Sequence, residues 1–334
     1  MVDSVVKESV RMQYTRREVG KLALTALPAA SLFGRPFDAL AQAKPNSTIN
    51  GVRVGAITYS YRRMKDQSAE ATLKYVVDSG ISQIEFMGGP VEAFAGAPQG
   101  PERGGGGGRR GGQPPTPEQQ AAQREAADKL KAWRTSVSMD RFKALRKMYN
   151  DAGVTIYAWK RLSPNMSNEE LEYMFNVAEA LGCTHTTLEL TDDVAALKRL
   201  GEFAEKKKIY VAYHTHLQGS MQAFDQAFAV SKGNMANVDL GHFVAAGGDP
   251  VAFLSKFHDR IASFHLKDRT TPANGQKNVP WGTGDTPLAT LLQMVKKNKW
   301  TMPATIEVEY DVPEGSDAVK EVAKCLNYCR TALA

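Results

Sequence analysis

Short runs of β-branched and aromatic residues alternate with amphipathic segments from residue 49 onward. The apolar runs predict buried strands, because a continuous apolar run suits a strand that is covered on both faces. They are 51–58, 82–87, 154–160, 184–190, 208–216, 236–240, 261–267 and 303–309. The segments between them have apolar residues three or four positions apart and predict helices. These are 68–79, 138–152, 167–181, 192–206, 220–231, 249–258, 286–298 and 316–332.

Local start and stop signals agree with this division. Ser167 and Glu170 form a capping-box pattern at the start of a predicted helix, and Gly153 and Gly182 stand where helices should end. Eight strand–helix pairs make up a closed parallel barrel, so the sequence predicts an α/β protein with one (β/α)₈ TIM-barrel domain. A doubly wound open sheet is the alternative. The first strand of such a sheet usually leads into a glycine-rich phosphate turn. In this chain the first predicted strand leads into residues 59–61 (YSY), which contain no glycine.

The N-terminal residues read as an export signal. Residues 15–21 are TRREVGK, 22–34 form a moderately apolar stretch, and 41–43 (AQA) have the small-x-small pattern of a signal-peptidase site. This arrangement resembles a bacterial twin-arginine signal, and the apolar stretch is too short for stable membrane insertion. We therefore predict a signal over 1–43, a barrel over 44–334, and a periplasmic or otherwise exported protein.

One segment interrupts the strand–helix rhythm. Residues 88–137 form an insertion after the second strand, low in complexity over 88–115 and helical and polar over 116–136. Such composition cannot bury a core. In a barrel the insertion would lie above the active site, where a lid and a flexible surface segment are the two alternatives.

The charge and the cysteine content of the chain limit the binding partners and bound groups that it could have. The formal net charge is +6, from 42 Lys and Arg against 36 Asp and Glu. Because this mild excess is spread along the chain, it indicates a solvated surface and no nucleic-acid partner. The three cysteines, Cys183, Cys325 and Cys329, form no CxxC pair, which argues against a disulfide scaffold or a zinc–thiolate site. Homo-oligomer formation stays open.

Ionisable residues gather at the ends of the predicted strands, where a barrel places its active site. They are Glu85, Lys160, Glu189, His214, His216, Asp239, His242, His265, Lys267, Glu307 and Glu309. Carboxylates and imidazoles in apolar strands are costly to bury unless they are paired or bind a metal. A mixed oxygen and nitrogen donor set suits one divalent ion, Mn²⁺, Co²⁺, Mg²⁺ or Zn²⁺. His185 begins its strand and is expected to be structural.

Several motifs at these strand ends resemble a known family. They are VDLGHFVAAGGDP (238–250), RIASFHLKD (260–268), WGTGD (281–285), TIEVE (305–309) and AYHTH (212–216). Together they resemble the sugar phosphate isomerase/epimerase proteins of the xylose-isomerase-like barrel superfamily, over about residues 50–332.

The resemblance implies a single divalent metal held by carboxylates and one histidine. Carried over by position, Asp239, His265 and Glu307 are expected metal ligands. Ketose 3-epimerases place a further glutamate on the fifth strand, but His214 stands there, so Glu189 is expected as the fourth ligand.

The remaining strand-end residues receive catalytic and binding roles. The expected catalytic residues are Glu307, His214, His216 and Lys267. The expected substrate-binding residues are Glu85, Trp159, Lys160, His242 and Glu309.

The resemblance implies an isomerase or epimerase that acts through an enediolate on a small carbohydrate or keto-sugar. A metal-dependent lyase or dehydratase of keto-sugars or keto-glycosides, similar to inosose dehydratase, is the alternative. Only Glu307 has a clear counterpart of the two proton-moving glutamates of the epimerases. Two further classes differ in metal content. A nuclease of the same superfamily would bind several ions, and a non-catalytic sugar-binding barrel would bind none.

Overall fold

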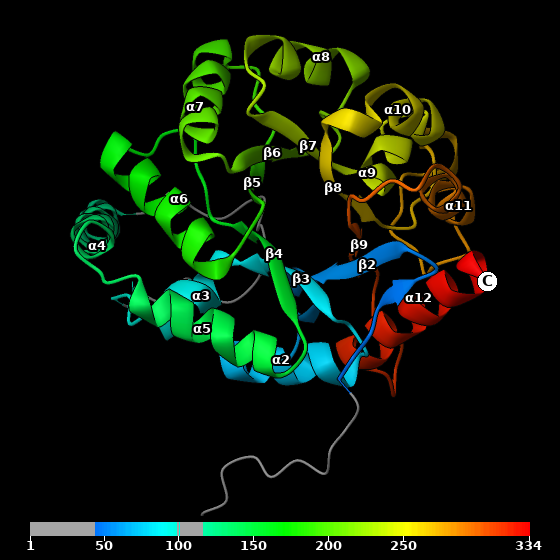
Figure 1. Cartoon of the computed structure of the whole chain (residues 1–334), viewed down its shortest axis with the longest axis horizontal. Coiled ribbons are helices and arrows are strands. Elements are labelled where there is room, and N and C mark those ends of the chain that lie inside the picture. The colour runs from blue at the N-terminus through cyan, green and yellow to red at the C-terminus, as the bar shows by residue number, and fades with distance from the viewer. Residues whose placement is uncertain (1–43, 99, 101–115) are drawn as a thin grey trace, which may run out of the picture. The chain divides into compact units, whose positions relative to one another are not determined.

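The computed structural model describes residues 44–98, 100 and 116–334. Eight parallel strands close into a barrel with helices around it (Figure 1), as the sequence predicts. The strands are β2 (Val52–Ile57), β3 (Gln83–Met87), β4 (Thr155–Lys160), β5 (His185–Glu189), β6 (Tyr210–His214), β7 (Asn234–Asp239), β8 (Ile261–Leu266) and β9 (Ala304–Ile306). The barrel closes where β9 pairs with β2, and the short β1 (Thr48–Ile49) adds antiparallel to β2. The predicted export signal over 1–43 lies outside the described residues and stays a prediction.

The surrounding helices fall where the apolar periodicity predicts them. They are α2 (Ala69–Asp78), α5 (Asp140–Asp151), α6 (Asn168–Leu181), α7 (Val194–Lys207), α8 (Met221–Val230), α10 (Pro250–Phe257), α11 (Leu288–Asn298) and α12 (Ala318–Leu333). The capping box of Ser167 and Glu170 is formed at the start of α6. The same helix ends at Gly182, whose φ of +77° is a conformation that glycine adopts without a steric penalty.

Two short helices follow strands without a signal in the periodicity. α3 (Gly88–Phe94) begins directly after β3, and α9 (Leu240–Ala245) directly after β7. Val91 of α3 is buried in the core, so the expectation that residues 88–115 cannot bury a core is wrong for their first part. Asp239 ends β7 and caps α9 by accepting a hydrogen bond from the His242 amide. A Cβ at Gly241 would lie 2.4 Å from the Lys267 carbonyl oxygen, so this glycine lets α9 pack against the chain that leaves β8.

Two irregular strand pairings decide which side chains enter the barrel. Ile84 pairs with Ile156, but Glu85 pairs with Ala158, which leaves Tyr157 as an extra residue on β4. Such a bulge interrupts the two-residue alternation of side chains. As a result, the Tyr157 hydroxyl reaches Thr305 of β9 at 2.7 Å.

A similar irregularity lies between β7 and β8. Ala236 pairs with Ile261, whereas Asn237 pairs with Ser263. Beyond this point the two strands run in register, and Asp239 lies beside His265. The irregularity therefore sets the ionisable residues of two neighbouring strands at one height.

A buried ion-pair cluster fixes the second half of the insertion, α4 (Pro117–Arg134), to the barrel. Glu92 of α3 is 3% exposed and accepts hydrogen bonds from Arg134 (2.8 Å), Arg161 (2.8 Å) and Tyr173 (3.2 Å). Arg134 also pairs with Glu170 of α6 at 3.1 Å. The C-terminal end of α4 is thus attached to α3 and α6.

We expect the substitution Arg134→Met to lower the free energy of unfolding by about 3 kcal/mol, because it leaves a buried carboxylate with one cation fewer. Urea denaturation would measure the loss, and thermolysin should cleave α4 faster in the variant. Lys129→Met is the control, since its exposed pair with Glu125 (2.7 Å) should contribute less than about 1 kcal/mol. Equal stability of the two variants would contradict the anchoring role of Arg134.

Candidate metal centre

Four buried side chains from consecutive strands converge at the C-terminal mouth of the barrel. His214 ends β6, Asp239 ends β7, His265 lies in β8, and Glu307 directly follows β9. One ligand atom from each lies within 4.8 Å of every other, and all four residues are buried. This spacing is what a single coordination sphere requires.

The structure brings together the three ligands carried over from the resemblance, Asp239, His265 and Glu307. The fourth member of the group is His214, which sequence analysis treats as catalytic. Glu189, the expected fourth ligand, belongs to a second group with His214 and His216. Its carboxylate lies on the half-exposed rim of the mouth because it is the last residue of β5.

His265 lies between two carboxylates. Its Nε2 is 2.8 Å from Glu85 and its Nδ1 is 2.8 Å from Glu307. Burial alone would lower the pKa of His265, but the two negative charges raise it to about 10. Burial raises the pKa of Glu85, and the charge of His265 outweighs this and brings it to about 2. The three groups therefore form a charged, hydrogen-bonded unit. Because an imidazole binds a metal only in its neutral form, His265 would give up one of these protons on binding a metal.

Lys267 supplies a second buried positive charge. Its ammonium lies 2.9 Å from Asp239, 3.1 Å from Glu307 and 2.7 Å from Glu309. Burial lowers the pKa of Lys267, but these three carboxylates raise it well above its ordinary value. It also lies 3.0 Å from His242 Nε2.

One ring nitrogen of His214 has no hydrogen-bond partner. This nitrogen is Nδ1, and it is buried. Burial, together with the charges of Lys160 and His265, holds its pKa well below the ordinary value, so the imidazole is neutral. A neutral imidazole with an unpaired nitrogen can bind a metal through that nitrogen. The donor set of two imidazoles and two carboxylates, already neutralised in part by the Lys267 ammonium, fits a divalent cation.

A histidine–carboxylate pair lies beside this cluster at the mouth. His216 Nδ1 is 2.9 Å from Glu189, whose other oxygen is 2.9 Å from Lys160. The hydrogen bond to Glu189 raises the pKa of His216. The His216 side chain is 52% exposed, and its ring centroid is 4.7 Å from that of His242. Because Nδ1 is engaged, Nε2 is the nitrogen available to a substrate.

Sequence analysis assigned five residues to substrate binding, and they lie in three places. Lys160, His242 and Glu309 lie at the mouth, in contact with the groups described above. Glu85 is fully buried beneath His265. Trp159 is fully buried and packs against Tyr173 of α6, because the bulge at Tyr157 places it on the helix side of the wall.

A polar layer below the cluster was missed by sequence analysis. The Glu85 carboxylate accepts hydrogen bonds from Thr187 (2.7 Å) and Asn237 (3.1 Å). Asn237 also donates to Ser263 at 2.7 Å, and Ser263 lies 2.8 Å from His185 Nε2. The signal was present, since polar residues two apart, such as His185 and Thr187, share one face of a strand.

The WGTGD motif has a structural role beside the centre. Asp268, next to Lys267, accepts hydrogen bonds from the amides of Gly282 (2.8 Å), Thr283 (3.1 Å) and Gly284 (2.9 Å). A Cβ at Gly284 would lie 2.3 Å from the Asp268 carboxylate. The glycine therefore permits the close approach by which this loop fixes the chain that follows β8.

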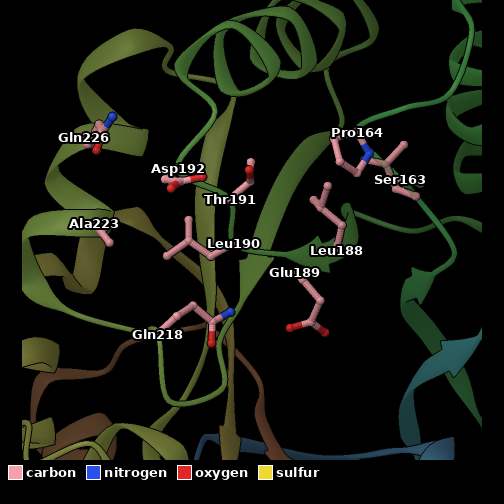
Figure 2. Close-up of a pocket in the computed structure, with 11 residues that line it drawn as sticks. Ser163, Pro164, Leu188, Glu189, Leu190, Thr191, Asp192, Gln218, Ala223 and Gln226 are labelled. Carbon is pink, nitrogen blue, oxygen red and sulfur yellow. The ribbon is translucent and has the colours of Figure 1, made fainter. Parts of the chain in front are cut away.

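A cavity of about 670 Å³ opens next to the His216–Glu189 pair. Figure 2 shows Glu189 and Gln218 at one end of it, and Gln226, Asp192 and Thr191 at the other. Glu189 thus belongs both to the lining of this cavity and to the rim of the barrel mouth.

The closed parallel barrel makes this a TIM-barrel protein, and the imidazoles and carboxylates at the ends of four adjacent strands form its candidate metal centre. Residues 126–329 match the family described as "Xylose isomerase-like TIM barrel", and the chain belongs to that family.

Two curated relatives are named inosose dehydratase. That of Clostridium beijerinckii is 34% identical over 77 residues, which are 22% of this chain and 26% of the relative. That of Bacillus thuringiensis is 28% identical over 120 residues, 34% of this chain and 38% of the relative. The chain therefore matches between about a quarter and two fifths of the length of these relatives.

Solved structures share the fold over most of the chain. A xylose isomerase domain protein of Alicyclobacillus acidocaldarius has a TM-score of 0.59 at 15% identity, covering 84% of this chain and 99% of that one. The "probable 3-DHS dehydratase AsbF" of Bacillus anthracis has a TM-score of 0.56 at 14% identity, covering 83% and 99%. At these identities the likeness concerns the fold alone.

Two smaller expectations concern cysteines and membranes. Cys183, Cys325 and Cys329 are buried and free of disulfides, as sequence analysis predicts. Among the helices of the described residues, none combines the length and the apolar character needed to cross a membrane.

The polar layer predicts an acid-sensitive barrel. Burial lowers the pKa of His185 from 6.5 to about 4. The unfolded chain therefore binds this proton more readily than the folded chain, and stability falls as pH drops from 6.5 towards 4, by about 3 kcal/mol. We expect His185→Gln to reduce the difference in unfolding free energy between pH 7 and pH 4.5, as measured by urea denaturation. His258→Gln, an exposed site on the surface, is the control and should show the full wild-type difference.

Proposed function

We propose that this protein is a divalent-metal-dependent enzyme that removes a proton beside a carbonyl group of a small carbohydrate. The observation that carries the proposal is the convergence of four buried ligand groups next to a half-exposed histidine–carboxylate pair. The first arrangement suits charge stabilisation and the second suits proton transfer. The names of the curated relatives, which are dehydratases, agree with this chemistry.

His214, Asp239, His265 and Glu307 would hold the metal. When bound, a divalent cation supplies Lewis-acid stabilisation of negative charge on the carbonyl oxygen. Glu85 would orient His265, because a carboxylate hydrogen-bonded to one imidazole nitrogen directs the other towards the metal.

His216 is the proposed base. Its Nε2 accepts the proton from the carbon beside the carbonyl, and Glu189 holds the ring through Nδ1 and stabilises the charge that forms. Lys160 keeps Glu189 in place from the other side. Lys267 and His242, which lie 3.0 Å apart, present polar groups to the same mouth.

Two outcomes can follow the removal of this proton. Its return to the other face or to the neighbouring carbon gives an epimerase or isomerase. The loss of a hydroxyl group from the adjacent carbon, which takes a proton and leaves as water, gives a dehydratase. We favour the dehydratase, because the described mouth offers one half-exposed histidine–carboxylate pair to move protons, and because the curated relatives carry that name.

We expect the metal-loaded protein to contain about one ion per chain, as a single four-ligand site requires. Asp239→Asn should retain less than a tenth of this amount after dialysis, as measured by elemental analysis. Asp249→Asn is the matched control, since Asp249 is an exposed helix cap that should leave the metal content unchanged. Full occupancy in the Asp239 variant would exclude this ligand set.

We expect proton abstraction to be visible as deuterium uptake from D₂O into a recovered keto-sugar, with scyllo-inosose and fructose as the first probes. His216→Gln should slow the uptake by about 100-fold while the metal content is unchanged, because general-base catalysis contributes on that scale. His258→Gln should exchange at the wild-type rate. A product lighter by one water, found by mass spectrometry, would support the dehydratase, and deuterium uptake without it would support the isomerase or epimerase.

A further inference from the structure

We infer that the cavity beside Glu189 binds a second, uncharged sugar ring, so that the substrate is a disaccharide or glycoside whose reacting ring lies at the candidate metal centre. This inference rests on the proposed function and adds to it the class of substrate. We call this cavity the β4–β6 groove. It is lined by Leu162, Ser163, Pro164, Leu188, Glu189, Leu190, Thr191, Asp192, Gln218, Ala223 and Gln226.

The position of the groove is the first argument. It is built by the segment that follows β4, by the end of β5 and the segment after it, by the loop after β6 and by α8. Glu189 belongs both to the groove and to the group formed with His214 and His216. Gln218 is likewise shared, since its side chain accepts a hydrogen bond from the His216 amide at 2.8 Å. A molecule that reaches His216 therefore has the groove directly beside it.

The size of the groove is the second argument. A volume of about 670 Å³ lies in the middle of the range of about 300–1,000 Å³ that pockets for drug-sized ligands occupy. The groove lies beside the centre and does not include its buried ligands Asp239, His265 and Glu307. A monosaccharide held at the centre would leave this volume to water.

The chemistry of the lining is the third argument. Leu162, Leu188 and Leu190 supply an aliphatic wall, whereas two carboxamides and two hydroxyl groups supply donors and acceptors at the edges. In Figure 2, Leu190 lies between Gln218 on one side and Thr191 on the other. A sugar ring has the same division, with C–H faces and hydroxyl edges. A purely apolar group would match the aliphatic wall alone and would use none of the carboxamides and hydroxyl groups at the edges.

The charge of the lining excludes a phosphorylated unit. Glu189 and Asp192 are the ionisable residues of the groove, and no lysine or arginine is among its lining residues. Anion recognition relies on arginine, lysine or converging backbone amides. Lys160, which lies 2.9 Å from Glu189, is already paired with that carboxylate. The groove therefore suits a neutral ring.

The test is calorimetric binding of sugars to the full chain loaded with Mn²⁺. Cellobiose and maltose would be compared with glucose, and lactose with galactose. We expect at least one disaccharide to bind about tenfold more tightly than its monosaccharide, because a filled subsite adds contacts on that scale. Equal affinities for every pair would overturn the inference.

Two variants, each with a control, test whether the preference for a disaccharide arises in the groove. Ala223→Trp fills the groove from α8 and should abolish the preference for the disaccharide, while Ala229→Trp places the same bulk on an exposed position of that helix outside the groove and should preserve it. Gln226→Ala should weaken disaccharide binding about fivefold, as the loss of one hydrogen bond would. Its control, Gln222→Ala, removes an exposed glutamine of the same helix that does not line the groove. A disaccharide preference that survives in Ala223→Trp would place the second ring elsewhere and overturn the assignment.

These measurements separate the subsite from the proposed reaction. Calorimetry measures the affinity for sugars without turnover, whereas metal content and deuterium uptake test the proposed reaction. A disaccharide preference without deuterium uptake would keep the subsite and reject the proposed chemistry. Deuterium uptake in a monosaccharide, together with equal affinities for every sugar pair, would keep the chemistry and reject the subsite.

Discussion

The barrel depends on the neutralisation of charges that are buried inside it. His265 lies between Glu85 and Glu307, and Lys267 lies among three carboxylates that include Asp239. An isolated charge in this interior would cost many kcal/mol, so each of these groups is tolerated only because the others are present. The network therefore constrains the strands that carry it. β7, β8 and β9 must hold their register, because a shift of one residue would turn these side chains towards the helices.

The same network explains why a cation fits this place. Asp239 and Glu307 both face the Lys267 ammonium, and the neutral His214 of the same group has an unpaired ring nitrogen. The site thus combines an excess of carboxylate with an imidazole that needs a partner. A divalent ion satisfies both needs at once, since it takes up negative charge and accepts the nitrogen lone pair. Glu85, held from below by Thr187 and Asn237, fixes the orientation of the His265 ring through its hydrogen bond to Nε2.

Much of this arrangement is encoded in short-range patterns. Apolar runs and capping signals were sufficient to place eight strands and eight helices. The strand-end rule gathered the ionisable residues at one mouth, and the family resemblance selected Asp239, His265 and Glu307 among them. The positions of Trp159 and Glu85 were not predictable in this way. They depend on the bulge at Tyr157, which arises from the packing of β3 against β4 and has no sequence signal of its own. Likewise, the choice between His214 and Glu189 depends on how deep each strand end lies in the mouth, a property of the closed barrel.

Reaction and selectivity are consequently assigned to different parts of the molecule. The ligand groups lie at the ends of barrel strands or directly after them, where the hydrogen bonds of the closed sheet hold the backbone in place. The β4–β6 groove is built from the segments after β4, β5 and β6, where substitutions change the shape of a pocket without disturbing the buried charges. Glu189 is the point at which the two parts meet, because it orients His216 on one side and lines the groove on the other. A ligand in the groove would therefore contact the residue that positions the proposed base, and binding there would be coupled to the position of that base.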